Sequence, residues 1–226
     1  MISRSPQRPK RAHWLDRWTR YFFLVAGVLA LGYVAFVMLD TQLFQAYENW
    51  RFEKALKEPR QSKSSEPPSL SPQPPVVADP VSVRLERLRA AGPEGSPLGR
   101  IEISTLGVEV MILEGVEPRT LRRAVGHIPG TALPGQRGNV ALAGHRDTFF
   151  RSLRDIPKDA EITLTTLHGS YRYRVDSTIV VEPQAVEVLA DSPDATLTLV
   201  TCYPFDFIGH APKRFIVRAR KISGSG

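Results

Sequence analysis

An apolar run covers residues 21–39, which read YFFLVAGVLALGYVAFVML and include no charged side chain. At about 1.5 Å per residue, a helix of this length spans the roughly 30 Å hydrocarbon core of a bilayer and satisfies its own backbone hydrogen bonds there. Aromatic side chains flank the run at Trp14, Trp18, Tyr47 and Trp50, as is typical of interfacial anchors. The pattern predicts one transmembrane helix, in contact with membrane lipid, over residues 21–39.

A cleaved signal peptide and a buried core helix are the alternatives for this run. A signal peptide has an apolar core of about 7–15 residues followed by a small-x-small cleavage site. The run is longer than that, and the sequence LDTQLFQAYENW at its end offers no such site. A buried helix is rarely apolar on all of its faces. We therefore expect an uncleaved anchor.

The residue pattern and composition of the chain change twice between the apolar run and residue 98. Residues 40–57 have a helix-compatible pattern and are expected to form a juxtamembrane segment that prolongs the membrane helix. Residues 58–97 are expected to form a linker, whose first part is rich in Pro, Ser and charge and therefore favours an extended spacer. A short helix is expected over residues 81–91, either as a plain connector or, in a second hypothesis, as a lid across the functional site.

Residues 98–226 show the short alternating pattern of β-strands. A hairpin is expected around residues 168–170, and a short helix over residues 118–126, which begin with a proline. The expected strands read LGRIEIS, GVEVMILEG, VALAG, EITLTTL, YRYRVDSTIVV, TLTLVTC and RFIVRARKI. Seven or eight short strands with few helices favour an all-β domain, a closed or nearly closed β-barrel, because closure leaves no long strand edge exposed.

The positive charge of the chain is concentrated at its N-terminus. The formal net charge is +7, and residues 1–20 contain six Lys or Arg residues against one acidic residue. The rest of the chain therefore lacks the dominant basic surface of a nucleic-acid-binding protein, and we expect no nucleic-acid partner. By the positive-inside rule, a basic tail before an apolar run stays in the cytoplasm, so everything after residue 39 is expected outside.

Cys202 is the only cysteine and ends the predicted strand TLTLVTC. A single cysteine excludes an intrachain disulfide framework, and an unpaired thiol is prone to oxidation outside the cytoplasm. An inert buried thiol is the plain alternative. However, a strand end that opens into a loop is a place where scaffolds present functional groups, and a thiolate there can act as a nucleophile.

His145 is the histidine best placed to be the acid/base partner of Cys202. It directly follows the predicted strand VALAG, so it occupies a strand end in the same way as Cys202. The other histidines precede the membrane run, occupy the hairpin turn or lie in loops, and none of them is expected to be essential; they are His13, His168, His127 and His210.

Arg214 begins the last predicted strand. In a strand, Arg214, Ile216 and Arg218 share one face, whereas Phe215 and Val217 share the other. If the second face is buried, Arg214 points away from the core, near the loop that follows Cys202. There its permanent charge can stabilise a thiolate or an oxyanion. A solvated surface arginine is the alternative.

In combination, these motifs resemble the sortase family. The matching pieces are TLVTC at 198–202, AGH at 143–145 and KRF at 213–215, and the longer strings AGHRDTFFRSL and TLVTCYPFDFIGHAPKRFIV are similar to the class D branch. The resemblance covers about residues 98–222. It implies a sortase-type closed eight-stranded β-barrel, with His145, Cys202 and Arg214 as catalytic residues, Thr201 as a supporting group, and neither cofactor nor metal.

The resemblance also implies a membrane-anchored cysteine transpeptidase on the outer face of the bacterial cytoplasmic membrane. Sortases cleave an LPxTG-like motif near the C-terminus of secreted proteins and join the freed carboxyl group to an amine of peptidoglycan precursor or a pilin lysine. Cys202 would form a thioacyl enzyme, His145 would protonate the leaving amine, and Arg214 would hold the oxyanion. Asp147 and Asp206 lie nearby in sequence, but this chemistry requires no third acid. A membrane-anchored cysteine endopeptidase and a non-catalytic binding module are the alternatives.

Overall fold

The computed structural model describes residues 12–57 and 79–225 of the 226-residue chain. The protein divides into two compact units, with the boundary between Phe44 and Gln45, and each unit is described by itself. The basic residues before Ala12 and most of the predicted spacer, residues 58–78, lie outside the described residues.

Helix α1, Ala12–Lys57, contains the predicted membrane run. Within it, Arg17–Phe36 is the one stretch among the described residues that is long and apolar enough, by length and composition, to cross a membrane. None of this stretch is buried by other parts of the protein. The helix continues through residues 40–57, as the juxtamembrane pattern predicts, and its last turn carries Lys54 and Lys57.

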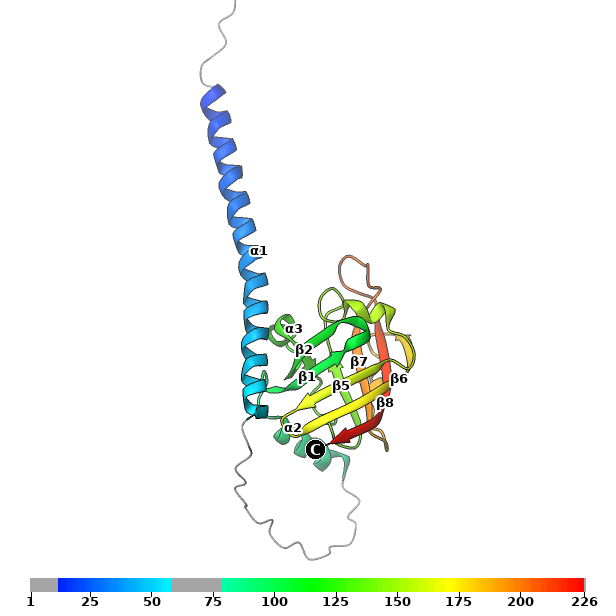
Figure 1. Ribbon diagram of the computed structural model, residues 1–226. Helices are drawn as coiled ribbons and strands as arrows, with labels where there is room; N and C mark the ends of the chain where they lie inside the picture. The colour runs from blue at the N-terminus through cyan, green and yellow to red at the C-terminus, as the bar shows by residue number, and fades with distance from the viewer. Residues whose placement is uncertain (1–11, 58–78, 226) are drawn as a thin grey trace, which may run out of the picture. The chain divides into compact units, whose positions relative to one another are not determined.

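The second unit is built around a closed β-barrel, whose strands follow the order β1-β2-β3-β4-β7-β8-β6-β5 (Figure 1). The strands are β1 (Pro97–Ile103), β2 (Val108–Glu114), β3 (Val125–His127), β4 (Asn139–Ala143), β5 (Glu161–Thr166), β6 (Gly169–Val181), β7 (Thr196–Tyr203) and β8 (Lys213–Ser225). The short helices of this unit are α2 (Pro80–Ala91), α3 (Pro118–Arg123), η1 (Ser104–Leu106), η2 (Arg151–Asp155) and η3 (Val186–Leu189). The predicted eight-stranded closed barrel with short helices is confirmed within the described residues.

Two of the strand pairs are parallel, namely β2 with β3 and β4 with β7, and the others are antiparallel. The parallel pairing puts the C-terminal ends of β4 and β7 at the same end of the barrel. The predicted hairpin joins β5 to β6, with Thr166 opposite Gly169. The helix predicted over residues 118–126 is too long, because α3 ends at Arg123 and the chain then extends into β3 to pair with β2.

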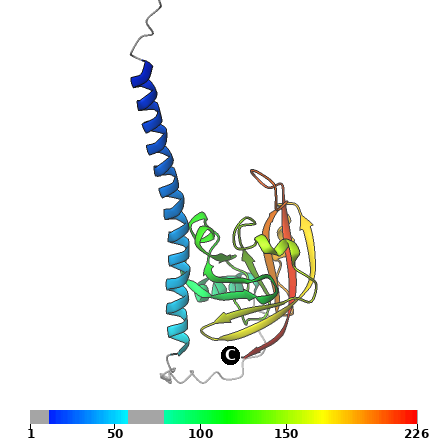
Figure 2. The same cartoon turned by 45° about the horizontal axis from the view of Figure 1, so that its top comes forward.

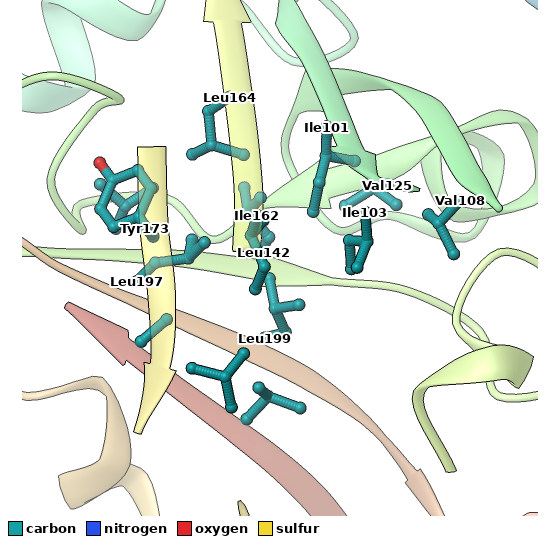
Figure 3. Close-up of a cluster of buried hydrophobic side chains, with 14 of the residues drawn as sticks. Ile101, Ile103, Val108, Val125, Leu142, Ile162, Leu164, Tyr173, Leu197 and Leu199 are labelled. Carbon is teal, nitrogen blue, oxygen red and sulfur yellow. The ribbon is translucent and has the colours of Figure 1, made fainter. Parts of the chain in front are cut away.

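The barrel interior is filled mostly by branched aliphatic side chains from alternating strand positions, together with aromatic ones such as Tyr173, as Figure 3 shows for a cluster of them. Leu197 and Leu199 of β7 and Val217 of β8 are fully buried in this cluster. Burial of each such side chain contributes about 1.5–3 kcal/mol relative to its exposure. Since side chains alternate along a strand, this inward set fixes which residues of β7 and β8 point outward.

A buried polar network braces β3 against the chain that precedes β4. His127 Nδ1 lies 2.6 Å from a carboxylate oxygen of Glu114, and its Nε2 lies 3.0 Å from the Ala132 carbonyl oxygen. A carbonyl only accepts, so Nε2 carries a hydrogen. The Thr131 hydroxyl donates to the Ile128 carbonyl and lies 3.0 Å from the same Nε2. His127 is therefore held as a structural group, at 1% exposure.

Helix α2 confirms the helix predicted over residues 81–91 and begins with Asp79 as its N-cap. Its Arg87 forms an ion pair with Asp191 at 3.1 Å and donates to the Arg137 carbonyl. These partners precede β7 and β4 in the chain, so α2 braces the end of the barrel at which those strands begin (Figure 1). The ends of β4 and β7, and the loop after β7, lie at the other end. This placement favours the connector over the lid.

Candidate active site

Cys202 lies near the C-terminal end of β7 and is in direct register with Arg214, near the start of β8. Residues directly opposite in an antiparallel pair project from the same face of the sheet, with Cβ atoms roughly 5 Å apart. Figure 2 shows the two strands side by side, joined by a loop that extends beyond the end of the barrel. The thiol and the guanidinium therefore start from adjacent positions on one surface.

This surface is the outer face of the barrel. Leu199 and Val217, which are opposite each other, fill the interior, and side chains alternate along each strand. Cys202 and Arg214 consequently point away from the core, as the sequence pattern predicts for Arg214. Both are half-buried, which leaves them accessible to a substrate while neighbouring side chains partly exclude water.

His145 follows β4, which pairs in parallel with β7 so that Ala143 lies opposite Val200. The pairing continues for one more residue, because the Gly144 amide donates to the Val200 carbonyl at 3.1 Å. His145 is the next residue after Gly144, and Cys202 lies two residues after Val200, so both residues lie at the same end of the barrel. The two strand ends singled out in the sequence thus lie at one end of the barrel, where Arg214 is paired with Cys202.

Thr201 connects the C-terminal end of β7 to the residue that follows β4. Its hydroxyl donates a hydrogen bond of 2.8 Å to the Gly144 carbonyl, and the side chain is only 2% exposed. The bond joins the residue before Cys202 to the residue before His145. Thr201 is therefore in position to support the site by fixing the spacing of the two strands, without itself pointing to the reacting groups.

Gly144 is required at its position by close packing. A Cβ atom on this residue would lie 2.7 Å from the Phe150 ring, which is completely buried. The Phe150 amide also donates to the His145 carbonyl at 3.1 Å, which closes a turn around the histidine. The backbone of His145 is thereby held between β7 on one side and a buried aromatic ring on the other.

The acidic residues near the site in sequence are engaged elsewhere or exposed. Asp206 forms an ion pair with Arg154 at 2.9 Å, and the hydrogen bond from this guanidinium lowers the pKa of the Asp206 carboxyl. Asp147 is exposed. Among the remaining histidines, His210 is exposed in the β7–β8 loop and His168 occupies the β5–β6 turn, whereas the side chain of His13 lies outside the described residues.

Sequence reasoning missed Arg146 and Phe150. Arg146 donates to three carbonyl oxygens of the β7–β8 loop, those of Pro204, Phe207 and Gly209. Both residues fall within the string AGHRDTFFRSL, so their nearness to His145 in sequence was the available signal. Their contacts depend on tertiary packing, which no local pattern encodes.

The comparisons with known proteins agree with this fold. The family model described as "Sortase domain" matches residues 101–222, which is more than half of the chain. Sortase D of Bacillus subtilis (strain 168) is 28% identical over 204 residues, covering 89% of this chain and 96% of that protein. Sortase A of Listeria monocytogenes is 29% identical over 123 residues, covering 53% of this chain and 54% of the relative.

Solved structures give the same result. A Clostridium perfringens sortase D5 transpeptidase superposes with a TM-score of 0.54 at 28% identity, covering 63% of this chain and 99% of that chain. The SrtA sortase of Actinomyces oris superposes with a TM-score of 0.55 at 30% identity, covering 59% of this chain and 84% of that one. The barrel, the matched domain and these relatives together establish that the chain belongs to the sortase family of cysteine transpeptidases.

Proposed function

We propose that the protein is a membrane-anchored transpeptidase that uses Cys202 as nucleophile, His145 as general acid and base, and Arg214 as oxyanion stabiliser. Two observations carry the proposal: Cys202 and Arg214 are paired across β7 and β8, and His145 follows β4 two residues after the Ala143–Val200 pair. A nucleophile, a proton carrier and a fixed positive charge on adjacent strands satisfy the geometric needs of acyl transfer.

The proposed reaction begins with attack of the Cys202 thiolate on a peptide carbonyl carbon of an LPxTG-like motif in a secreted protein. The carbonyl oxygen becomes an oxyanion, which the Arg214 guanidinium stabilises. When the tetrahedral intermediate collapses, the C–N bond breaks and the His145 imidazolium gives its proton to the departing amine. A thioester on Cys202 and a neutral His145 remain.

The second half of the reaction regenerates the enzyme. An incoming amine, from peptidoglycan precursor or a pilin lysine, attacks the thioester carbonyl and passes a proton to His145. The C–S bond breaks, an amide forms, and Cys202 returns to the thiolate. Shielding of the thioester from water favours aminolysis over hydrolysis, which is the difference between a transpeptidase and an endopeptidase.

Arg214 binds the substrate oxygen through N–H donors other than those of Nη1, which bind backbone carbonyls. Its Nη1 donates to the Ala211 carbonyl at 3.2 Å and to the Lys213 carbonyl at 3.0 Å. A guanidinium carries further N–H donors on the other nitrogens, arranged in a rigid planar fork. The loop carbonyls thus orient the fork while leaving donors for the developing negative charge.

The proposed location is the bacterial cytoplasmic membrane, with a single span over residues 21–39, residues 1–20 inside, and the barrel outside. The support is the apolar length of the helix and the basic residues that precede it. External protease should digest the C-terminal domain in intact cells whose outer layers have been made permeable. A domain that resists until the cytoplasm is opened would contradict this topology.

The activity is tested with the full chain in detergent, an LPxTG-like peptide and a graded concentration of an amine nucleophile. The proposal expects an amide product whose share rises with amine concentration and which disappears in Cys202→Ala. Hydrolysis alone at high amine concentration would favour an endopeptidase. Retention of the biological function by Cys202→Ala would favour a non-catalytic binding module.

A further inference from the structure

Arg146, which directly follows His145, binds the middle of the loop that connects Cys202 to Arg214. Its Nη1 donates to the Pro204 carbonyl at 2.9 Å. Its Nη2 donates to the Gly209 carbonyl at 2.9 Å and to the Phe207 carbonyl at 2.6 Å. The guanidinium carbon also lies 5.9 Å from the centre of the Phe207 ring. One side chain thus gathers three carbonyl oxygens that are spread over the loop.

Phe205, at the start of the loop, packs against Phe215 and the core, but the tip of the loop has few other groups that could fix its path. Ile208 at its tip is 97% exposed, and Phe207 is 44% exposed, so apolar burial contributes little there. The Phe207 amide donates weakly to the Pro204 carbonyl, at 3.4 Å, and Asp206 is tied to Arg154 on the protein surface. Charge-assisted hydrogen bonds are roughly twice as strong as neutral ones, so the three Arg146 contacts and the Asp206–Arg154 pair are the strongest polar contacts that hold this segment.

The geometry links all three active-site residues through this one loop. One end of the loop follows Cys202, and the carbonyls of Ala211 and Lys213 near the other end accept hydrogen bonds from Arg214. Arg146 is the covalent neighbour of His145. A displacement of the loop would therefore change the orientation of the Arg214 fork relative to both His145 and Cys202.

We propose that Arg146 is a positioning residue that, through the β7–β8 loop, sets the orientation in which Arg214 meets the oxyanion. The inference rests on the proposed function of Arg214. It assigns to Arg146 no contact with substrate. A lysine at position 146 keeps the charge but lacks the planar fork, so it cannot hold the three carbonyls in the same arrangement.

The test measures single-turnover acylation of the full chain in detergent by an LPxTG-like peptide, together with thermal unfolding. Arg146→Ala should lower the acylation rate by roughly 10- to 100-fold, the range typical of a catalytic group displaced by about 1 Å, with little change in peptide binding. Arg146→Lys should lose an intermediate factor. Arg172→Ala is the matched control, since Arg172 is an exposed arginine hydrogen-bonded to Ser223, and it should acylate like the wild type.

A double variant separates positioning from plain structural support. If Arg146 acts through Arg214, adding Arg146→Ala to Arg214→Ala should cost less than about threefold, because residues that act as a unit are non-additive. The inference would be overturned if the losses of acylation rate in the two single variants multiplied in the double variant. It would also be overturned if Arg146→Ala acylated within about twofold of the wild-type rate at unchanged stability. If Arg146→Ala does not fold, the same comparisons are made with Arg146→Lys, and wild-type rates in that variant would overturn it. Failure of the proposed function itself has a different signature, namely a wild type that forms no adduct on Cys202.

Discussion

Cys202 and Arg214 are direct partners in the antiparallel β7–β8 ladder, although the exposed loop that joins these strands separates them in sequence. The ladder therefore sets the backbone spacing of Cys202 and Arg214, the proposed nucleophile and oxyanion stabiliser, whereas the loop carbonyls orient the guanidinium. Because strand positions alternate between faces, the same ladder points both side chains outward and keeps Leu199 and Val217 in the core. The stability of the barrel and the geometry of the site have a common origin.

Removal of the Arg214 guanidinium should impair catalysis without unfolding the barrel. Arg214→Ala is expected to lower the acylation rate by about 10²- to 10³-fold, the usual effect of losing an oxyanion donor. Thermal unfolding should change little, because the side chain is half-buried on the outer face. Arg218→Ala is the control, since Arg218 is exposed on the same face of β8. A similar loss of rate in both variants would argue against a specific role for Arg214.

A pair of variants measures how much the hydrogen bond from Thr201 to Gly144 contributes to stability and to acylation. Thr201→Val keeps the shape but leaves the buried Gly144 carbonyl without this donor, at an expected cost of about 1–3 kcal/mol in the free energy of unfolding. Thr201→Ser keeps the hydroxyl and should retain most of both stability and acylation. Chemical denaturation and single-turnover kinetics give the two readouts, and equal behaviour of valine and serine would refute the connecting role.

A methyl group at position 144 should disturb both packing and activity. The Cβ of Gly144→Ala would meet the Phe150 ring at 2.7 Å, and this ring is fully buried and cannot move aside freely. Overpacking of this kind costs about 1–3 kcal/mol of stability and should also displace His145. The smaller side chain of Phe150→Leu, added to Gly144→Ala, should restore part of the stability. A double variant less stable than both single variants would contradict the steric account.

Tyr173 should make barrel stability sensitive to alkaline pH. Burial raises the pKa of Tyr173 from 10.0 to about 12. Because the folded pKa is above the unfolded one, the neutral phenol stabilises the fold below pH 10, and this contribution is lost as pH rises from 10 to about 12. Urea denaturation across this range should show a steeper loss for the wild type than for Tyr173→Phe. Parallel pH profiles would contradict the assignment.

Much of the fold could be predicted because it is encoded in local alternation. The pattern of RFIVRARKI assigns Phe215 and Val217 to the inner face, and the structure places Val217 in the core. The parallel β2–β3 pair could not be predicted in this way. Val125–His127 is too short to give a strand signal, and its extended path is stabilised by its neighbours β2 and β4. The helix predicted over residues 118–126 was therefore too long.

The site could be predicted in part for a similar reason. His145 and Cys202 each follow a clear strand pattern, and the barrel brings the two strand ends together. Arg146 gives no such signal, because its partners are loop carbonyls whose positions depend on how the β7–β8 loop folds back. Backbone carbonyls are identical at every residue, so sequence alone cannot identify which of them a guanidinium will bind.

A covalent intermediate at Cys202 is the central step of the proposed mechanism. Intact-mass and peptide-mapping analysis of the full chain, quenched in acid during turnover of an LPxTG-like peptide, tests it most directly. We predict an added mass equal to the acyl fragment, located on Cys202, absent in Cys202→Ala and discharged as an amide when an amine is supplied. Peptide cleavage without any adduct on Cys202, or cleavage that persists in Cys202→Ala, would contradict the central claim.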